Sequence, residues 1–372
     1  MERRTWLFLL ALLVPTFVLV YAEVPADTWG STAALSLGAG ASALVLMAAA
    51  ALLGGRLRFV EALFGGLDRV YATHKWLGIA ALAFASAHLL FKAGAEGWEI
   101  ASIVGLPSPW TRFVRQLSYV VLMLIVMLAL NRAIPYRTWR WWHKLSGPLF
   151  LVVVLHWLSI RSPIALGSPA GVWLSLVVGA GIAAAFYKLL LYPRFSSHAE
   201  YRVATVVPGP ASLGLELAPV GRGIDFVPGQ FGFLSLHAPG LREPHPFTIA
   251  SATRPDERVR FVIRALGDYT TQLRANVRTG MHATVHAPFG RFHRRRGARE
   301  VWIGGGVGIS PFLSWLDDAR GGFENVTLFY FHAPGRAFPS AEVLDALARE
   351  RGVEFVSVED GPESPLFARR FG

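Results

Sequence analysis

The chain has no cysteine among its 372 residues. This absence excludes disulfide bonds, haem held or attached through sulfur of cysteine, zinc–thiolate sites and iron–sulfur clusters ligated by cysteine alone. Any redox metal must therefore be held by His, Met, Tyr or carboxylate side chains. Charged residues are also scarce, at 16% of the chain against about 25% in an average soluble protein.

The charged residues are distributed unevenly. Residues 1–192 contain 15 Lys and Arg and 7 Asp and Glu, whereas residues 193–372 contain 21 and 18. We therefore expect a membrane domain followed by a water-soluble one. Most of the net charge of +11 lies in the apolar half, where basic loops orient membrane helices. With no basic helix or known binding module, this charge does not indicate nucleic-acid binding.

A helix needs about 20 mostly apolar residues to cross a bilayer. Six segments qualify: residues 5–22, 33–53, 71–92, 113–131, 143–160 and 170–191. The first has no small-residue cleavage site after it, so we expect a retained helix and not a signal peptide. Arginine-rich loops fall mostly on one side, which predicts a multi-pass protein of the inner (plasma) membrane with both termini in the cytoplasm.

Histidines occur in only two of the six segments, as matched pairs. His74 and His88 lie in the third segment, and His143 and His156 in the fifth. A rise of about 1.5 Å per residue separates the members of each pair by about 20 Å. Because ionisable side chains inside spans are functional candidates, we expect two stacked haems, one between His74 and His143 and one between His88 and His156. A proton path or packing histidines are the alternatives.

The spacing within the second pair does not fit an ideal helix. At about 100° per residue, His156 points about 220° away from His143, whereas His88 returns almost to the direction of His74. Gly147-Pro148 lies between the second pair, and proline removes a helix hydrogen bond and bends the axis. We therefore expect an irregular turn there that restores the phase.

After Tyr192-Pro193-Arg194 the pattern changes to short β runs at residues 201–207, 213–217, 230–236 and 258–265, typical of a small antiparallel barrel. A strand at 299–303 then leads into a glycine loop and a helix from Phe312. Glycines in this context let backbone amides approach a phosphate at a helix N-terminus. The residues predicted to bind a dinucleotide pyrophosphate are Gly304, Gly305, Gly306, Gly308, Ser310 and Pro311.

Four motifs occur together in the second half. They are His245-Pro246-Phe247-Thr248, Gly267-Asp268-Tyr269-Thr270, Pro288-Phe289-Gly290 and the glycine loop. Together they resemble the ferredoxin-reductase type of FAD/NAD(P) module. With the paired histidines, the whole chain resembles bacterial members of the NADPH oxidase and ferric reductase superfamily.

The resemblance implies a multidomain fold. Residues 1–192 would form a six-helix transmembrane bundle with two b haems, residues 193–297 an antiparallel β-barrel FAD domain, and residues 298–372 an α/β Rossmann-like NADP domain. Phe247 would pack on the isoalloxazine and Thr248 would hydrogen-bond near the flavin N5, which makes both catalytic. His245, Pro246 and Gly267 would also bind the cofactor, and Arg264 and Thr270 would contact the FAD pyrophosphate, since arginine binds phosphate oxygens in a fork.

The implied function is electron transfer from cytosolic NADPH through FAD and two b haems to an acceptor outside the cytoplasm. O2, giving superoxide, is the first choice of acceptor, with ferric-chelate reduction or transfer to a periplasmic protein as alternatives. A haem-carrying structural component with a degenerate flavin lobe is a further one.

The sequence predicts NADPH in preference to NADH. An acid after the second strand of a dinucleotide fold binds the ribose 2′-hydroxyl and repels a 2′-phosphate. After the strand at 326–331 no carboxylate occurs until Glu342, and Arg336 follows a Pro-Gly turn that aims it at the phosphate. Only a short tail follows the strand at 353–358, without the Cys-Gly-Pro element of the family. We therefore expect an incomplete NADP lobe with weak binding and slow hydride transfer.

Overall fold

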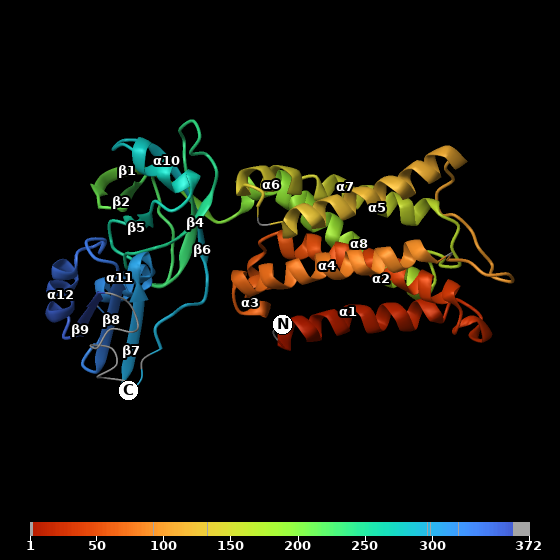
Figure 1. Ribbon diagram of the computed structural model, residues 1–372, viewed down its shortest axis with the longest axis horizontal. Helices are drawn as coiled ribbons and strands as arrows, with labels where there is room; N and C mark the ends of the chain where they lie inside the picture. The colour runs from red at the N-terminus through yellow and green to blue at the C-terminus, as the bar shows by residue number, and fades with distance from the viewer. Residues whose placement is uncertain are drawn as a thin grey trace. The chain divides into compact units, whose positions relative to one another are not determined.

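The computed structural model describes residues 3–91, 93–131, 133–295, 297, 299–318 and 320–359. The chain forms two compact units that divide after Phe195. The first unit is helical, and the second contains two β-sheets (Figure 1).

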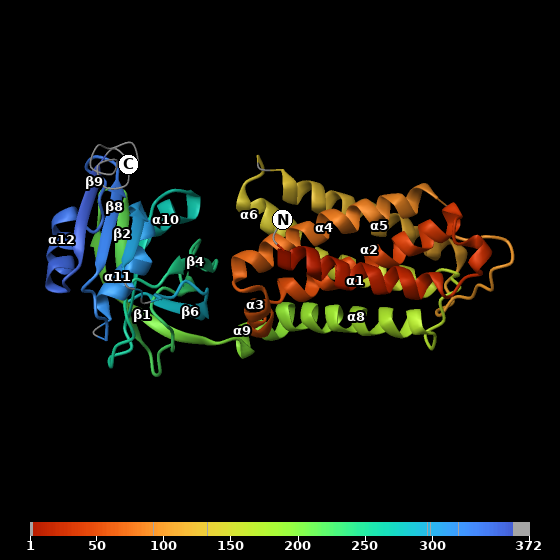
Figure 2. The same cartoon turned by 90° about the horizontal axis from the view of Figure 1, so that it is seen from below.

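Six helices of the first unit correspond to the six predicted segments: α1 (Arg3–Tyr21), α2 (Thr32–Gly54), α4 (Leu67–Leu90), α5 (Ser108–Leu130), α7 (Ser146–Ser159) and α8 (Pro169–Phe186). They run alongside one another in a single bundle (Figure 2). Shorter elements connect them: the 3-10 helix η1 (Ala26–Thr28), α3 (Arg58–Phe64), α6 (Tyr136–His143), the π-helical η2 (Tyr187–Leu191) and α9 (Tyr192–Phe195).

The helix α2 is at the centre of this bundle. It packs against α1, α4 and α8, and most of its residues are buried. Small residues bring the helix backbones close together, since a Cβ added at Gly181 of α8 would lie 2.8 Å from the Cα of Ala48. The outer faces of α1 and α5 instead expose Leu, Val and Met side chains, as expected of helices that contact lipid.

Four helical stretches of the described chain are long and apolar enough to cross a membrane: Arg3–Tyr21, Thr32–Gly54, Ser108–Leu130 and Pro169–Phe195. The chain is therefore a multi-pass membrane protein. The two predicted spans outside this set carry the paired histidines. α4 has 24 residues but includes charged and His side chains, and α7 has 14, about 21 Å against a bilayer core of about 30 Å. The six-span bundle stays a prediction.

The fifth predicted segment is not one continuous helix. α6 ends at His143, Lys144 and Leu145 form a turn, and α7 begins at Ser146. Pro148 lies in the first turn of α7, where its missing N–H removes no helix hydrogen bond. The prediction of an irregular turn at Gly147-Pro148 is therefore wrong in position, because the break comes before the proline.

The second unit begins with a six-stranded antiparallel sheet. Its strands are β1 (His198–Pro208), β2 (Ser212–Pro219), β3 (Phe231–Leu236), β4 (His245–Thr248), β5 (Val259–Arg264) and β6 (His282–Phe289), in the order β4-β3-β6-β1-β2-β5. Just after β4, Ile249 bridges Phe261, and the N–H of Ala250 donates to the carbonyl oxygen of Arg260 at 2.7 Å. The sheet thus closes almost completely, which confirms the predicted antiparallel barrel.

The interior of the barrel is filled by apolar side chains from all parts of the sheet, such as Leu215, Leu234 and Val285. Tyr201 is among the largest fully buried side chains, and its hydroxyl accepts a hydrogen bond from the N–H of Ile224 at 2.9 Å. The helix α10 (Asp268–Asn276) connects β5 to β6.

The rest of the second unit is a smaller α/β lobe. Its parallel strands β7 (Glu300–Gly305), β8 (Val326–His332) and β9 (Glu354–Glu359) lie in that order. The 3-10 turn η3 (Gly306–Ile309) and α11 (Ser310–Asp317) follow β7, and α12 (Ala341–Glu350) follows β8. Both helices pack on one face of the sheet, around Trp302, Leu328 and Tyr330. α11 thus begins two residues before the predicted Phe312, and the predicted incomplete C-terminus falls beyond Glu359, outside the described residues.

Tyr201→Phe is expected to lower the free energy of unfolding of the barrel by about 1–3 kcal/mol, because the buried N–H of Ile224 would lose its acceptor. Hydrogen exchange across β1 and β2 measures this change. Thr205→Val, at an exposed position of the same strand, is the matched control. Equal exchange in the two variants would contradict the prediction.

Candidate functional site

The structure brings the four histidines of the first unit together in two pairs. The ring centres of His74 and His143 lie 5.9 Å apart with the ring planes at 76°. Those of His88 and His156 lie 6.4 Å apart with the planes at 61°. An imidazole nitrogen lies about 2.0–2.1 Å from a bound first-row metal such as zinc. Rings at this separation therefore leave room for one metal ion between them.

Backbone carbonyl groups of α2 hold both histidines of α4. The Nδ1 of His74 lies 2.9 Å from the carbonyl oxygen of Ala50, and the Nδ1 of His88 lies 2.9 Å from that of Ser36. Because a carbonyl oxygen only accepts, Nδ1 carries the proton in both rings, and Nε2 is left as the ligand atom. The sequence alone does not reveal these contacts.

The histidines of α6 and α7 have no such support. Within the described residues, the Nδ1 atoms of His143 and His156 are buried and make no hydrogen bond. Trp139 stacks on His143 with ring centres 5.1 Å apart. Leaving a buried polar atom without a partner costs about 1–3 kcal/mol, a cost that metal ligation by the same rings would offset.

Two glycines shape the space around the rings. A Cβ added at Gly40 of α2 would lie 2.8 Å from the Nδ1 of His88. Any side chain larger than that of glycine would therefore clash with this ring. A Cβ at Gly78, one turn beyond His74, would meet nothing within 4 Å, so the helix surface at Gly78 is open. Two pairs of facing imidazoles, one near each end of α4, are a donor set that suits two haems. The sequence does not mark Gly40 as a site residue, although Gly40 lies in a run of small residues of the kind that pack membrane helices.

Apolar side chains fill the levels between the two pairs. Leu82 and Ala85 of α4 and Leu149 and Val153 of α7 belong to one cluster, together with residues of α2 and α5. The backbones of α4 and α7 are not among the closely packed helix pairs. Apolar side chains therefore separate the two histidine pairs along the bundle. The same side chains bridge the space between the backbones of α4 and α7.

The predicted flavin motif forms β4 at one edge of the barrel sheet. His245, Pro246, Phe247 and Thr248 pair with Leu234, Phe233, Gly232 and Phe231 of β3. Phe247 is half-buried and packs on the barrel interior, and Thr248 is also half-buried. The ring of His245 stacks on that of Tyr269 with centres 3.7 Å apart.

Tyr269 itself escapes the sequence analysis as a site residue, although it lies inside a quoted motif. Burial raises the pKa of its phenol, and the charge of Glu243 raises it further. The phenol therefore stays protonated at neutral pH and donates to the carbonyl oxygen of Leu241 at 3.2 Å. This bond fixes the ring against which His245 stacks.

The hydroxyl of Thr270 is engaged within its own turn. It accepts hydrogen bonds from the N–H groups of Leu266 and Gly267 at 3.0 and 3.1 Å. Thr270 and Gly267 thus shape the N-terminus of α10, which begins four residues after Arg264. Their contact with the FAD pyrophosphate stays a prediction.

A cavity of 460 Å³ lies at the carboxyl ends of β7 and β8, where open α/β sheets bind ligands. Its lining from the α/β lobe is Gly305, Gly306, Val307, residues 330–334, Arg336 and Phe338, and from the barrel Ala211, Ser212 and Arg264. Both arginine side chains are exposed, and within the described residues no hydrogen bond or ion pair of Arg264 or Arg336 involves a side chain. Arg264, predicted to contact FAD, thus lies in the same cavity as Arg336.

The other residues of the glycine loop support this cavity from outside it. Gly304 is buried, and a Cβ there would lie 3.1 Å from the side chain of Ile309. The hydroxyl of Ser310 donates to the carbonyl oxygen of Val307 at 2.7 Å. Pro311 lies in the first turn of α11, and Gly308 is exposed. Gly305 and Gly306 are therefore the loop positions whose backbone lines the cavity.

Two family models match the chain. The Ferric reductase like transmembrane component covers residues 39–154, which include three of the four paired histidines. The FAD-binding domain covers residues 215–303. The chain is thus a membrane-bound oxidoreductase with a flavin domain, and it is similar to NADPH oxidases and ferric reductases.

The curated relatives match parts of the chain. The electron transfer component of anthranilate 1,2-dioxygenase from Acinetobacter baylyi is 32% identical over 127 residues, 32% of this chain and 36% of that protein. Human dual oxidase 1 is 36% identical over 107 residues, 26% of this chain and 7% of that protein. The chain spans about a third of the length of the first of these relatives.

Solved structures are similar to part of the chain, at lower sequence identity. A ferredoxin NADP⁺ reductase from Neisseria gonorrhoeae with bound FAD and NADP has a TM-score of 0.39 and 21% identity. The match covers 45% of this chain and 70% of that one.

Gly40→Ala is expected to remove haem from the His88/His156 pair, because the added Cβ pushes the imidazole away from the Ser36 carbonyl. Overpacking of this kind costs about 1–3 kcal/mol. Haem per protein, measured by the pyridine haemochrome spectrum, tests the change. Gly179→Ala is the control, since a Cβ there meets nothing within 4 Å. Full haem content in Gly40→Ala would contradict the assignment.

Arg336→Ala is expected to raise the KM for NADPH by about ten- to a hundredfold and to leave the KM for NADH nearly unchanged. A charge-assisted hydrogen bond contributes about 1.5–3 kcal/mol, and about 1.4 kcal/mol is tenfold in affinity. Steady-state kinetics with the two cofactors measure the difference. Equal losses for both would mean that Arg336 supports its loop and does not bind the 2′-phosphate.

Proposed function

We propose that the protein transfers electrons from cytosolic NADPH, through FAD and two b haems, to an acceptor on the outer side of the membrane. The observation that carries this proposal is that four histidines face one another two by two. The ring centres lie 5.9 Å apart in His74 and His143 and 6.4 Å apart in His88 and His156. They occur in the same chain as a barrel and an α/β lobe with a cavity at its strand ends.

The cofactors supply the electron chemistry: bound flavin accepts a hydride and releases electrons singly, and bound haem iron carries one electron at a time. His74 and His143 hold the inner haem, and His88 and His156 the outer one. A haem held by two histidines in this way would carry electrons and would not itself bind the acceptor. The hydrogen bonds from Nδ1 to α2 keep the α4 rings in the ligating tautomer.

The second unit binds the two nucleotides. Gly305 and Gly306 line the cavity, and backbone N–H groups at such a position suit a pyrophosphate. Arg336 binds the 2′-phosphate of NADPH, which favours this cofactor over NADH. On the barrel, Phe247 packs on the isoalloxazine, and Thr248 hydrogen-bonds near its N5.

The acceptor is O2, which takes one electron and leaves as superoxide. Reduction of an Fe(III) chelate is the second candidate, favoured by the ferric reductase model that matches the membrane unit, while dual oxidase 1 is among the relatives. Transfer to a periplasmic protein is the third. Ligation of each iron by two histidines suits all three, because none of them needs an iron–acceptor bond.

The purified protein is expected to contain two low-spin b haems and FAD, and NADPH is expected to reduce the haems without O2. His88→Ala should lose one haem while NADPH still reduces the flavin, because the inner pair and the second unit are intact. His198→Ala, an exposed histidine of the second unit, is the control.

Separate addition of O2 and of a ferric chelate to the reduced protein then identifies the acceptor by the reoxidation of haem. One haem or none in the intact protein would overturn the proposal. Haem spectra without bound flavin would instead favour a structural haem protein.

A further inference from the structure

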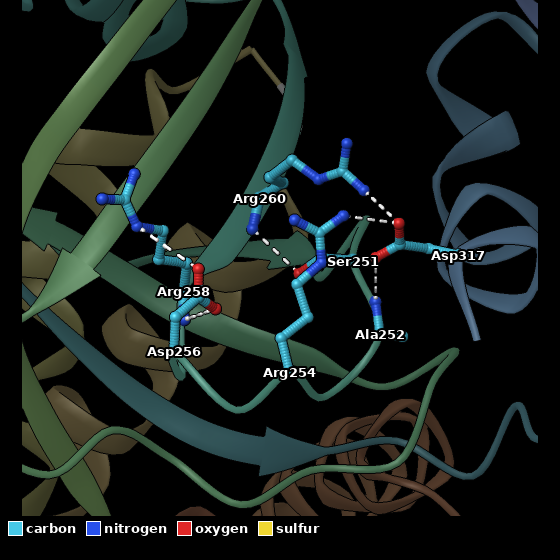
Figure 3. Close-up of polar contacts among 7 residues, drawn as sticks. All are labelled: Ser251, Ala252, Arg254, Asp256, Arg258, Arg260 and Asp317. Atoms are coloured by element: carbon cyan, nitrogen blue, oxygen red, sulfur yellow. Dashed lines mark hydrogen bonds and ion pairs between the residues drawn. The ribbon is translucent and has the colours of Figure 1, made fainter. Parts of the chain in front are cut away.

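Asp317 lies at the end of α11, between the α/β lobe and the barrel. Its carboxylate accepts hydrogen bonds from Arg254, with nitrogen–oxygen distances of 2.6 and 3.1 Å, and from the backbone N–H of Ala252 at 2.9 Å. Arg260 of β5 adds an ion pair at 2.7 Å. Figure 3 shows these groups converging on Asp317 from the barrel side.

The contacts join the two predicted cofactor sites by a short path. At one end, β4 ends at Thr248 and leads directly to Ala252, while the neighbouring Ser251 is fully buried and accepts the N–H of Arg260 at 3.0 Å. At the other end, α11 has only 8 residues, about 12 Å of helix, and begins at Ser310, directly after η3. Asp317 therefore links the flavin strand to the far end of the phosphate-binding helix.

Helix stability does not explain an acid at this position. A carboxylate at a helix C-terminus faces the negative end of the helix dipole, and a partly buried charge loses hydration. Only 15% of the Asp317 side chain is exposed. Arg254 and Arg260 offset both costs. The Asp317 carboxylate is therefore stabilised by its contacts with the barrel and not by its own helix.

The lobes also make apolar contacts that do not depend on Asp317. Phe292 stacks on Trp315 with ring centres 5.0 Å apart, and the indole N–H of Trp315 donates to the carbonyl oxygen of Pro228 at 3.0 Å. Ala250 belongs to the apolar core of the α/β lobe. Loss of the Asp317 charge therefore leaves the lobes packed together but removes the polar bonds that fix their angle.

We propose that Asp317 is a positioning residue for hydride transfer. It holds the phosphate-binding end of α11 at a fixed place relative to β4, so that the nicotinamide of bound NADPH meets the flavin at the reactive distance. This role rests on the proposed function, because it requires both nucleotides to bind as described above.

The contacts of Asp317 with Arg254, Arg260 and Ala252, here called the clamp, are expected to persist over the physiological pH range. Burial raises the pKa of Asp317, but the hydrogen bonds from Arg254 and Ala252 and the charge of Arg260 outweigh it, so the pKa lies below its ordinary value. A lowered pKa means that the ionised clamp is present at neutral pH and is lost only as the pH falls through the folded-state value. Nearby Arg258 pairs with Glu216 and Asp256, and Asp256 adds to the negative charge beside Arg254.

The test is stopped-flow reduction of the flavin by NADPH without O2, in the full chain loaded with FAD. Asp317→Asn is expected to lower the limiting rate constant by about ten- to a hundredfold, the cost of a misplacement of about 1 Å. The dissociation constant of NADPH should change by less than about threefold, because no binding contact is removed. Asp317→Glu, which keeps the charge, should restore part of the rate.

Asp318→Asn is the matched control, because Asp318 is the next residue and pairs with Arg320 of its own loop. Hydrogen exchange in the protein without NADPH gives a second readout. Asp317→Asn should speed exchange at the N–H of Ala252 and along the glycine loop, and Asp318→Asn should not.

A limiting rate in Asp317→Asn within about twofold of the wild type would overturn the positioning role, as would a loss of FAD and of NADPH affinity together, which indicates a purely structural part. If NADPH fails to reduce the flavin of the wild type, the proposed function itself is wrong and the positioning role falls with it. These outcomes are distinct.

Discussion

The hydrogen bonds from His74 and His88 to two backbone carbonyls of α2 are the constraint on which the membrane unit depends. Each bond, at 2.9 Å, fixes the tautomer that carries its proton on Nδ1 and leaves Nε2 as the ligand atom. α2 can do this because small residues such as Gly40 let α4 approach it closely. The central helix is therefore both the core of the bundle and the support of its candidate metal ligands.

Much of this architecture is visible in the sequence, because it depends on local patterns. Hydropathy indicates the long helices, and the composition changes after Tyr192, three residues before the division between the two units. Two glycines between a strand and a helix, Gly305 and Gly306, line the cavity. β4 is harder to predict, since it has four residues and contains Pro246, which normally argues against a strand. Pro246 is tolerated because β4 lies at the edge of the sheet.

The features that the sequence does not reveal are contacts between distant residues. A backbone carbonyl such as that of Ala50 has no side-chain signature, and Asp317 meets Arg254 across 63 positions. The sequence predicts the break at Pro148 because proline normally interrupts a helix, but a proline in the first turn is compatible with one, and the break comes before Ser146. Hydropathy also underrates α4, because the same histidines that make it functional lower its apolar character.

The central claim is that electrons cross the membrane through this single chain. The most direct measurement uses sealed, O2-free proteoliposomes of the FAD- and haem-loaded protein, with ferricyanide trapped inside and NADPH added outside. The account predicts that molecules with their second unit outward reduce the trapped ferricyanide, and that His156→Ala stops this while external ferricyanide is still reduced. Reduction confined to external ferricyanide in the wild type would contradict it.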